Sequence, residues 1–411
     1  MSAGERVLIL GAGQAGGRAA EALRKAGFAG AVCLIGDEEE PPYERPPLSK
    51  SVLLGEKPPD STRLLPPAFY AEHRIELLTN TRAVAIDPAA RRLALADGRR
   101  LAYDKLLIAT GGRVRVLRGA AVDRPGIHYL RTIADAVAFG AALRQSKRLA
   151  VIGGGFLGLE AAASAAKLGL AVVVLEAERH LLDRAMAPAI AEAVLALHRA
   201  KGVDVRLGAR VSEVGGDGRI EWLRLDDGSR LEADLVLVAI GILPNSELAA
   251  EAGIKVGDGI VVDELGQSSA AGVYAVGDVS YHPNPILGRS HRLESWQNAQ
   301  NQAIAVARGI AGTPSPYAEV PWFWSDQHGV NIQMVGAPAK TEAVVWRGEV
   351  ASGRAIAFNL DAGAVVGATA FNMGGEIRFA RQLIERRARI EPDMLADPGR
   401  KLRDFLGTSP A

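Results

Sequence analysis

Cysteine is nearly absent from the sequence, and this scarcity excludes several kinds of redox chemistry. Cys33 is the only cysteine among 411 residues. One thiol cannot form an intrachain disulfide or a Cys-x-x-Cys redox pair, and it cannot supply the four thiolates of an iron–sulfur cluster. Because Cys33 lies inside the apolar pattern of residues 31–35, we expect a small core residue.

Excess charge and long apolar runs are also missing. The formal net charge is +1, so there is no electrostatic case for binding nucleic acid or a membrane surface. The longest apolar runs, such as residues 235–240, have the length of a strand and not of a membrane span. Residues 1–5 show no signal-peptide pattern. We therefore expect a cytoplasmic protein without a nucleic-acid or membrane partner.

The composition is that of a globular protein with several cores. Apolar residues make up 48% of the chain and charged residues 23%. A chain of this length holds two or three domains, each able to bury its own core.

The most informative stretch lies at residues 148–160. An apolar strand pattern, residues 149–152, runs into Gly153, Gly155 and Gly158 and then into an Ala-rich helix pattern. A second apolar strand, residues 171–175, ends at Glu176. This is the pattern of a dinucleotide-binding βαβ turn, in which the glycines permit a tight turn, a close approach to a pyrophosphate and close helix packing. The helix N-terminus offers N–H groups to the phosphates.

The N-terminal part of the chain repeats this pattern. Strand residues 7–10 are followed by Gly11, Gly13 and Gly16, and a second strand ends near Asp37. Short strand patterns then follow in both parts. Their Asp-Gly turns, at residues 97–98 and 227–228, lie 130 residues apart, as do the closing glycines Gly111 and Gly241. The sequence therefore predicts two copies of one dinucleotide-binding domain, each a parallel sheet with a small antiparallel excursion.

The first copy carries an insertion, residues 41–67, that the second lacks. It is rich in proline, which predicts a stiff extended loop, with Ser49 capping a short helix through Leu54. The insertion has two open interpretations. It contacts a ligand at the carboxyl edge of the sheet, or it is a plain surface excursion.

The segments after Gly241 complete the domain plan. Strand patterns at 260–262 and 273–276 are expected to finish the sheet of the first domain, followed by a helix at 295–310. From Pro321 onward, strand patterns at 331–335, 343–347, 355–359 and 365–370 precede a long basic helix at 376–389. The fold class is therefore α/β, with two Rossmann-like domains, the second inserted in the first, and a C-terminal α+β domain. The predicted boundaries are 1–112 and 245–320, 113–244, and 321–411.

Two dinucleotide sites in one chain suggest a flavin and a nicotinamide that face each other, with FAD in one copy and NAD(P) in the other. A flavin takes a hydride as an electron pair and releases the electrons singly. With no dithiol and no cluster in the chain, these electrons must leave to a partner or to a small molecule.

Over nearly its full length the sequence resembles the FAD-dependent, NADH-using ferredoxin reductases of bacterial oxygenase systems. The most specific strings are Arg-Pro-Pro-Leu-Ser-Lys at 45–50 and Pro-Trp-Phe-Trp at 321–324. Weaker ones are the two glycine turns, Ala-Thr-Gly-Gly at 109–112, Gly-Asp at 277–278 and Arg-Leu-Glu-Ser-Trp-Gln-Asn at 292–298.

This resemblance implies FAD in the N-terminal copy and NADH in the second copy. Arg45 is the expected phosphate partner, Asp37 the expected ribose partner and Asp278 the expected acceptor for the ribityl chain, although Asp278 is also explained as a turn residue. Trp296 matches a position of main-chain contact to the flavin. The cofactor-binding positions implied are Gly11, Gly13, Ala15, Gly16, Asp37, Arg45, Lys50, Arg82, Val84, Ala109, Thr110, Gly111, Gly153, Gly155, Phe156, Leu157, Gly158, Glu160, Glu176, Arg184, Gly241, Gly277, Asp278, Ser295, Trp296 and Trp324. No metal site is expected.

Glu160 is explained in two ways. An acid in the first turn of a helix suits the helix dipole, and that alone accounts for it. In the resembling family the matching Glu lies beside the nicotinamide and pairs with the Lys at the position of Lys50. Our hypothesis is that Lys50 and Glu160 are the catalytic residues and tune hydride transfer.

Glu176 is expected to decide the nucleotide. A carboxylate at the end of this strand accepts the ribose 2′-OH of NAD and repels a 2′-phosphate. Arg179 and Arg184 follow closely and are of the type that accommodates NADP. We expect NADH.

The predicted function is an NADH-dependent ferredoxin reductase that passes electrons singly to a transiently bound [2Fe–2S] ferredoxin, which feeds a cytochrome P450 or a ring-hydroxylating dioxygenase. The alternatives are reduction of rubredoxin or of a small acceptor such as a quinone, monodehydroascorbate or dioxygen, and a redox-responsive interaction protein like apoptosis-inducing factor. A monomer or weak homodimer is expected.

Two further groups of residues are candidates for docking a partner. Trp322 and Trp324 fit stacking on the flavin, the electron path or ordinary core packing equally well. Four arginines, at positions 63, 289, 292 and 308, fit either a rim that steers an acidic ferredoxin or scattered surface charge.

Overall fold

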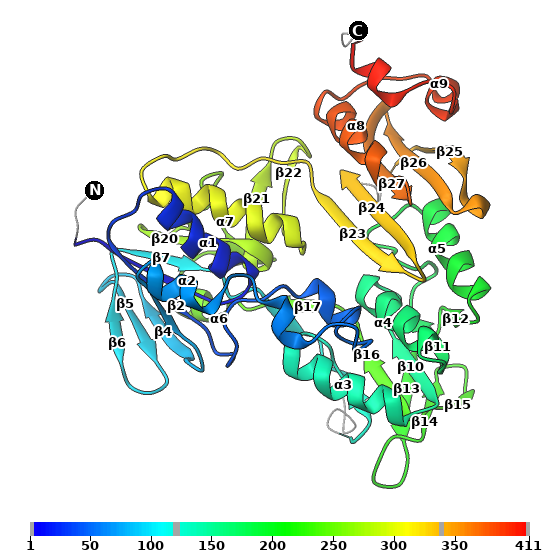
Figure 1. The fold of residues 1–411 in the computed structure, drawn as a ribbon, viewed down its shortest axis with the longest axis horizontal. Coiled ribbons are helices and arrows are strands. Elements are labelled where there is room, and N and C mark those ends of the chain that lie inside the picture. Colours follow the sequence, from blue (N-terminus) through cyan, green and yellow to red (C-terminus); the bar gives the residue numbers. More distant parts are fainter. Residues whose placement is uncertain (1–3, 118–123, 337–340, 408–411) are drawn as a thin grey trace. The chain divides into compact units, whose positions relative to one another are not determined.

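The computed structural model describes residues 4–117, 124–336 and 341–407, and the chain divides into two compact units (Figure 1). Unit 1 comprises Met1–Arg45, Asp60–Arg113 and Ile242–Glu319. Unit 2 comprises Pro46–Pro59, Val114–Gly241 and Val320–Ala411.

Unit 1 is built on a five-stranded parallel sheet with the order β20-β7-β1-β2-β3. Its strands are β1 (Arg6–Leu10), β2 (Ala31–Ile35), β3 (Ile75–Leu78), β7 (Lys105–Ile108) and β20 (Val273–Ala275). β1 lies at the centre and is covered on both faces, which explains its continuous apolar run. Helices α1 (Gln14–Lys25) and α7 (Trp296–Ile310) lie side by side against this sheet (Figure 1).

Smaller elements complete unit 1. An antiparallel sheet comprises β4 (Ala83–Asp87), β5 (Arg92–Leu95) and β6 (Arg100–Ala102). A four-stranded sheet comprises β18 (Val256–Gly257), β19 (Gly259–Val261), β21 (Ser280–Asn284) and β22 (Arg289–His291). Two short helices lie beside strands of unit 1: α2 (Pro67–Glu72) contacts β3 of the parallel sheet, and α6 (Glu247–Glu251) contacts β4. Of the two strands expected to finish the parallel sheet, β20 does so, whereas β19 pairs with β18 and β21 instead.

The sole cysteine behaves as a core residue, as the sequence predicts. Cys33 lies in β2 and is 1% exposed. Burial, with a smaller contribution from the negative charge of Glu76, raises the pKa of its thiol to about 12. The thiol is therefore protonated and inert at neutral pH.

Unit 2 repeats the parallel sheet, with the order β12-β11-β10-β16-β9. Its strands are β9 (Ile127–His128), β10 (Arg148–Ile152), β11 (Ala171–Glu176), β12 (Asp204–Leu207) and β16 (Leu235–Val238). Its helices are α3 (Ile133–Gln145), α4 (Phe156–Lys167) and α5 (Pro188–Ala200), and its antiparallel excursion is β13 (Val211–Gly215), β14 (Trp222–Leu225) and β15 (Arg230–Glu232). β1 lies between β7 and β2, and β10 lies between the corresponding strands β16 and β11. The predicted duplication is therefore present.

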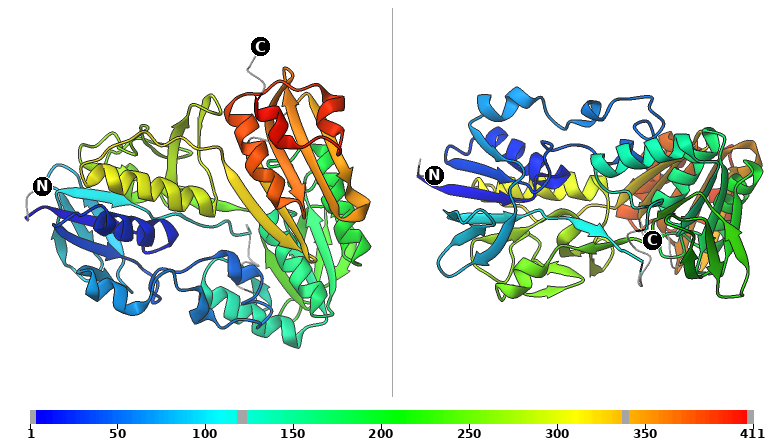
Figure 2. Two further views of the ribbon diagram at one scale, coloured as in Figure 1. Left: turned by 45° about the horizontal axis from the view of Figure 1, so that its top comes forward. Right: turned by 90° about the horizontal axis from the view of Figure 1, so that it is seen from below.

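The C-terminal part of unit 2 is an antiparallel sheet with the order β23-β24-β27-β26-β25. Its strands are β23 (Trp322–Gln327), β24 (Val330–Gly336), β25 (Ala343–Glu349), β26 (Arg354–Asp361) and β27 (Ala364–Phe371). Helix α8 (Gly374–Glu385) covers one face of this sheet, and α9 (Pro392–Ala396) lies by β25 (Figure 2). The sequence predicted four of these strands and a longer helix, and it missed β23.

The predicted fold class, two Rossmann-like sheets with a C-terminal α+β part, is confirmed. The three domain boundaries stay a prediction. A two-stranded sheet is formed by β8 (Gly112–Val114) and β17 (Ile242–Pro244). Across the ranges that the structure describes, no helix has both the length and the apolar character that a bilayer span requires.

The proline-rich insertion of the first copy is folded, but not as expected. A 3₁₀ helix covers Pro46–Ser49, and turns follow it as far as Lys57. Ser49 therefore ends a short helix and does not cap one that runs through Leu54. Its hydroxyl instead donates a hydrogen bond to the carboxylate of Glu160.

Unit 1 also holds a pair of histidines on neighbouring strands, of which His282 is buried and His291 is half-buried. His282 of β21 faces His291 of β22, with ring centroids 5.3 Å apart, and the ring of Tyr317 lies 5.7 Å from that of His282. Among the described residues neither ring nitrogen of His282 has a hydrogen-bond partner. Burial, together with the neighbouring positive charge, lowers the pKa of each histidine to about 4.

These lowered pKa values predict a loss of stability in mild acid. The unfolded chain binds protons at these rings below a pH of about 6.5, whereas the folded chain does so only near pH 4. The free energy of unfolding therefore falls as the pH drops through this window, by about 1.4 kcal/mol per unit of pKa difference. Urea unfolding at several pH values measures this decline. In His282→Phe, which keeps the ring beside Tyr317, the decline should be shallower; an equal decline would contradict the assignment.

Candidate dinucleotide sites

The first glycine turn, in unit 1, accepts only glycine at two of its positions. Gly11 has a φ of +113°, and a Cβ there would lie 2.3 Å from the carbonyl oxygen of Ala109. A Cβ on Gly16 would lie 1.9 Å from the carbonyl oxygen of Gly11. The first contact fixes a tight turn at the carboxyl end of β1, and the second lets α1 pack closely on it.

Gly13 serves a different purpose. It is the N-cap of α1, yet no side chain caps the helix there. Among the described residues, a Cβ on Gly13 would meet no atom within 4 Å. The first N–H groups of α1 are thus left for an anionic ligand, and the backbone is open for its approach, which fits the pyrophosphate of a dinucleotide.

Unit 2 repeats this cradle with the same geometry. Gly153 has a φ of +109°, and a Cβ there would lie 2.4 Å from the carbonyl oxygen of Ala239. A Cβ on Gly158 would lie 2.2 Å from the oxygen of Gly153. Gly155 caps α4 without a side-chain hydrogen bond, and its Cβ position is open with respect to the residues the structure describes. Both copies therefore fit a dinucleotide.

In unit 1, charged side chains gather near the carboxyl edge of the sheet. Arg45 bonds Glu38 (Nη2–Oε1, 2.6 Å) and donates to the hydroxyl of Tyr43 (2.9 Å). The charge of Asp278 also acts on Arg45. Asp278 lies in the 3₁₀ turn Gly277–Val279 directly after β20, and Asp37 is exposed after β2. The structure thus brings Arg45 and Asp278 into one neighbourhood.

The other predicted FAD contacts lie on the same elements. Ser295 is the N-cap of α7, where its hydroxyl accepts the Asn298 N–H (3.1 Å), and Trp296 begins that helix. Thr110 donates its hydroxyl to the carbonyl of Asn245 (2.8 Å) in the turn after β7. The remaining positions are buried Ala15 in α1, exposed Arg82 and Val84 at β4, and Ala109 and Gly111 beside Thr110.

In unit 2, Glu176 is tied to the glycine turn. Its Oε2 accepts the N–H of Gly154 (2.7 Å), and its Oε1 accepts the N–H of Glu178 (2.8 Å). The carboxylate is therefore held at the end of β11, beside the N-terminus of α4. Arg184 is exposed and lies near Gly241, where a Cβ would be 3.4 Å from its Nη2. Phe156 and Leu157 form the first turn of α4.

The predicted pair of Lys50 and Glu160 is present. Lys50 Nζ lies 2.8 Å from Glu160 Oε1, and the side chain of Glu160 is 7% exposed. Two hydroxyls add to it: Ser49 donates to Oε2 (2.5 Å) and Ser325 to Oε1 (2.6 Å). Burying a carboxylate costs several kcal/mol unless it is paired and hydrogen-bonded, and here both oxygens are satisfied.

Sequence reasoning missed the roles of Ser49 and Ser325. Ser49 was assigned to a helix cap, and β23, which carries Ser325, was not recognised as a strand. The alternation within residues 321–327, with Ser325 and Gln327 two residues apart and fully buried, is the signal that was available.

The two tryptophans of β23 stack on each other. The ring centroids of Trp322 and Trp324 are 5.1 Å apart with an interplanar angle of 20°, and Trp322 Nε1 donates to Gln333 Oε1 (3.2 Å). Phe323, which lies between the two tryptophans in the sequence, contacts Phe156 of α4, with ring centroids 4.4 Å apart. The role of Trp324 in cofactor binding stays a prediction.

The arginines considered for partner docking differ in their surroundings. Arg292 is 7% exposed at its side chain and pairs with Asp258 (3.0 Å) and Glu294 (2.6 Å), so it is engaged within unit 1. Arg63 pairs with Asp60 (2.9 Å). Arg289 and Arg308 are exposed.

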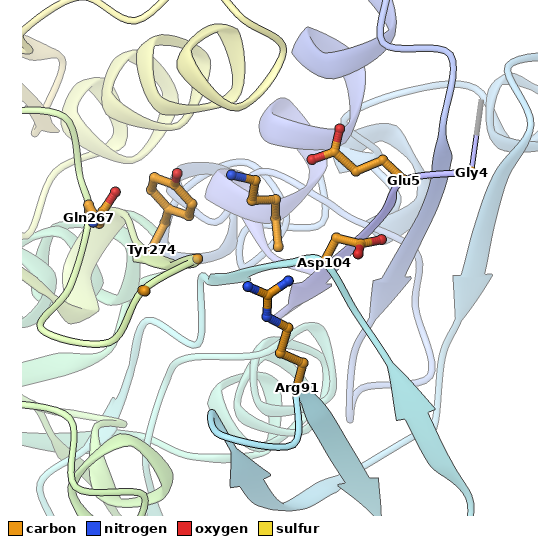
Figure 3. Close-up of a pocket in the computed structure, with 9 residues that line it drawn as sticks. Gly4, Glu5, Arg91, Asp104, Gln267 and Tyr274 are labelled. Carbon is orange, nitrogen blue, oxygen red and sulfur yellow. The ribbon is translucent and has the colours of Figure 1, made fainter. Parts of the chain in front are cut away.

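A polar cavity of about 640 Å³ lies elsewhere in unit 1. Figure 3 shows Glu5, Arg91, Asp104 and Tyr274 around it. Glu5, Asp104 and Gly272 directly precede β1, β7 and β20, so this cavity lies at the amino ends of the strands. Dinucleotides bind outside the carboxyl ends, and we do not assign this cavity to either cofactor. Among the described residues, no cluster of three or more His, Cys, Asp or Glu side chains is arranged to hold a metal ion.

Comparison with known proteins gives one consistent result. Residues 5–303 match the family described as pyridine nucleotide-disulphide oxidoreductase, and residues 322–406 match the family described as reductase C-terminal. The ferredoxin–NAD(+) reductase component of the anthranilate 1,2-dioxygenase system of Burkholderia cepacia is 42% identical over 97% of this chain and 98% of its own. Putidaredoxin reductase of Pseudomonas putida is 37% identical over 100% of this chain and 99% of its own.

Solved structures agree with these relatives. The ferredoxin reductase for the CYP199A2 system from Rhodopseudomonas palustris superimposes with a TM-score of 0.95 at 36% identity, covering 98% of this chain and 100% of its own. The covalent putidaredoxin reductase–putidaredoxin complex gives a TM-score of 0.96 at 37% identity, covering 98% of this chain and 99% of that chain.

The position of Glu176 leads to a prediction about nucleotide choice. Glu176→Gln keeps an oxygen for the N–H of Gly154 but removes the charge that repels a 2′-phosphate. The ratio of the dissociation constants of NADPH and NADH should fall about tenfold, measured by titration of the FAD-loaded protein with each nucleotide. Glu178→Gln, at the exposed neighbour that pairs with Arg210, is the control and should leave the ratio unchanged. An unaltered ratio in Glu176→Gln would contradict the role given to this carboxylate.

Proposed function

We propose that this chain, which belongs to the pyridine nucleotide-disulphide oxidoreductase family, is an NADH-dependent ferredoxin reductase. Its C-terminal part matches the reductase C-terminal family. It takes a hydride from NADH and delivers the electrons singly to a [2Fe–2S] ferredoxin. That ferredoxin serves a cytochrome P450 or a ring-hydroxylating dioxygenase. FAD and NAD(H) are its cofactor and its reductant.

One observation carries the proposal: the chain has two complete dinucleotide cradles and one buried, protonated cysteine. Two nucleotides allow a hydride to pass between them within one protein. Without a second thiol, the electrons cannot rest on a disulfide of this chain, so they must go to an external acceptor. Relatives that share nearly its full length are named ferredoxin reductases.

The chain's own residues divide the work between the two units. In unit 1, the N-terminus of α1 receives the pyrophosphate of FAD, and Arg45 and Asp278 hold its phosphate and ribityl groups. In unit 2, the N-terminus of α4 receives the pyrophosphate of NADH, and Glu176 selects its ribose. FAD, when bound, accepts an electron pair from NADH and releases it in single electrons. Lys50 and Glu160 act on the hydride transfer as a buried ion pair.

Turnover with different acceptors tests this function. The FAD-loaded protein with NADH should reduce a [2Fe–2S] ferredoxin taken from an oxygenase system much faster than it reduces rubredoxin, a quinone or dioxygen. Ferredoxin reduction is followed by the change in the visible absorption of its cluster. Rapid NADH oxidation with a quinone or dioxygen, and none with any ferredoxin of the panel, would contradict the proposal. We expect a monomer or weak homodimer, which sedimentation at several protein concentrations would distinguish from a stable oligomer.

The buried ion pair gives a sharper prediction. Glu160→Gln and Lys50→Met each remove one charge, and each should slow reduction of the flavin by NADH about tenfold, since an interaction worth about 1.4 kcal/mol in the transition state is a factor of ten. Stopped-flow absorbance at the flavin band measures the rate. The FAD content should stay unchanged.

A second ion pair between the insertion and helix α4 provides the control. Lys167 of α4 bonds Glu56 of the insertion (2.7 Å), but its side chain is 65% exposed. Lys167→Met and Glu56→Gln remove the same charges at the surface, where such a pair contributes little. Their flavin reduction rates should match the unmodified protein. Normal rates in both Glu160→Gln and Lys50→Met would show that the buried pair has no part in hydride transfer.

A further inference from the structure

The Glu160 carboxylate is the end of a buried chain of hydrogen bonds that runs through unit 2. Ser325 donates to Glu160 Oε1 (2.6 Å), and Gln327 Nε2 donates to Ser325 Oγ (3.0 Å). Gln327 Oε1 lies 2.9 Å from His198 Nε2. His198 Nδ1 lies 3.1 Å from His328 Nε2. The three middle members, Ser325, Gln327 and His198, are each fully buried.

The direction of each bond follows from the carboxylate. Two donors already meet Oε1 of Glu160, and a carboxylate only accepts, so the proton of Ser325 points toward it. The oxygen of Ser325 must then accept, which places the NH₂ group of Gln327 against it. The carbonyl of Gln327 therefore faces His198, whose Nε2 must carry a proton to donate. No other orientation of the amide satisfies both of its neighbours.

The histidine end of the chain obeys the same logic. Burial lowers the pKa of His198, although its bond to Gln327 acts the other way, so the ring is neutral at neutral pH. A neutral ring with a proton on Nε2 has a bare Nδ1, which accepts from His328 Nε2. Burial, with smaller contributions from the neighbouring His198 ring and the positive charge of Lys201, lowers the pKa of His328 to about 4. Every donor in the chain thus points toward Glu160.

The chain connects three separate elements. Ser325 and Gln327 lie on the same face of β23, His198 lies near the end of α5, and Glu160 lies in the first turns of α4. His328 has a φ of +51° in the tight turn between β23 and β24. The C-terminal sheet therefore supplies polar groups to a carboxylate of helix α4, which packs on the parallel sheet of the same unit.

We propose that Ser325, Gln327 and His198 are positioning residues that fix the orientation of the Glu160 carboxylate toward Lys50 for hydride transfer from NADH. This inference rests on the function proposed above for Glu160. Aligned donors of a buried chain polarise one another, so each bond strengthens the next and the carboxylate loses rotational freedom. Preorganised groups need not reorient during the reaction, and this is the source of their contribution to the rate.

The same chemistry excludes a proton relay along this chain. A hydroxyl or an imidazole passes a proton by accepting one and releasing another. The amide of Gln327 donates from nitrogen and accepts at oxygen, so it would have to pass through its imidic acid form. The Gln327 amide therefore fixes the donor-to-acceptor direction of the hydrogen-bond chain, and no proton passes through it.

The kinetic test separates positioning from binding. Ser325→Ala and His198→Leu should lower the limiting rate of flavin reduction by NADH about fivefold to tenfold, while the dissociation constant of NADH changes less than about twofold. His198→Gln keeps a donor for Gln327 and should restore much of the rate. Thr369→Val, at another fully buried hydroxyl of the same sheet, is the matched control and should leave the rate unchanged.

A second measurement does not depend on turnover. Nitrogen-15 NMR of protein labelled at its seven histidines reports the protonation of each ring nitrogen, and the His198→Gln variant assigns the His198 signals. We expect His198 to be neutral with its proton on Nε2, and we expect its shifts to move in Ser325→Ala and Glu160→Gln. A proton on Nδ1, a cationic ring, or shifts that ignore both substitutions would overturn the proposal.

The failure of this inference can be told from the failure of the proposed function. If Glu160→Gln slows flavin reduction while Ser325→Ala and His198→Leu do not, Glu160 acts without the chain and the positioning role is overturned. If Glu160→Gln leaves the rate unchanged, the role of Glu160 in hydride transfer is wrong, and the positioning role is overturned with it. Ferredoxin turnover by the unmodified protein tests the overall function independently of both.

Discussion

A buried carboxylate is the constraint on which the arrangement of unit 2 depends. Glu160 is 6% exposed, and a charge in that position is tolerated only where partners replace the lost water. No single element of the nucleotide-binding sheet provides them. Lys50 and Ser49 come from an insertion more than 100 residues earlier in the chain, and Ser325 comes from a strand more than 100 residues later. Helix α4 can therefore keep an acid near its N-terminus only because two distant segments fold against it.

This requirement explains two features that otherwise look unrelated. The insertion of the first copy leaves unit 1 after Arg45 and returns at Asp60, and the intervening residues belong to unit 2. A plain surface excursion would have no reason to be buried at Leu48, Ser49 and Leu53. In the C-terminal sheet, β23 alternates polar side chains, which face the carboxylate, with the stacked Trp322 and Trp324. Both segments supply the polar groups that the glycine turn itself cannot provide.

The sequence predicts the two parallel sheets well because their signals are local. Apolar runs, glycine turns and the repeat at 130 residues are all readable along the chain. The pair of Lys50 and Glu160 was predicted only through a family resemblance, since nothing local links these two positions. Ser325, Gln327 and His198 were missed because a hydrogen-bond chain depends on which faces of distant elements meet. Ser49 was misread because its spacing before an apolar segment suggests a helix cap, whereas its hydroxyl bonds a carboxylate 111 residues away.

The two copies share a cradle but differ where the chemistry differs. Counted from the first glycine of each turn, Glu160 of α4 corresponds to Arg18 of α1. Arg18 bonds Glu21 within its own helix (2.9 Å), and its guanidinium also lies 3.9 Å from Glu44 at the start of the insertion. An arginine near the helix N-terminus adds positive charge where a bound pyrophosphate brings negative charge, which suits a cofactor that stays. The acid in the second copy is paired with Lys50 of the insertion, so it depends on a segment distant in the sequence. The duplicated fold therefore provides two similar glycine turns, and one helical position carries opposite charges in the two copies.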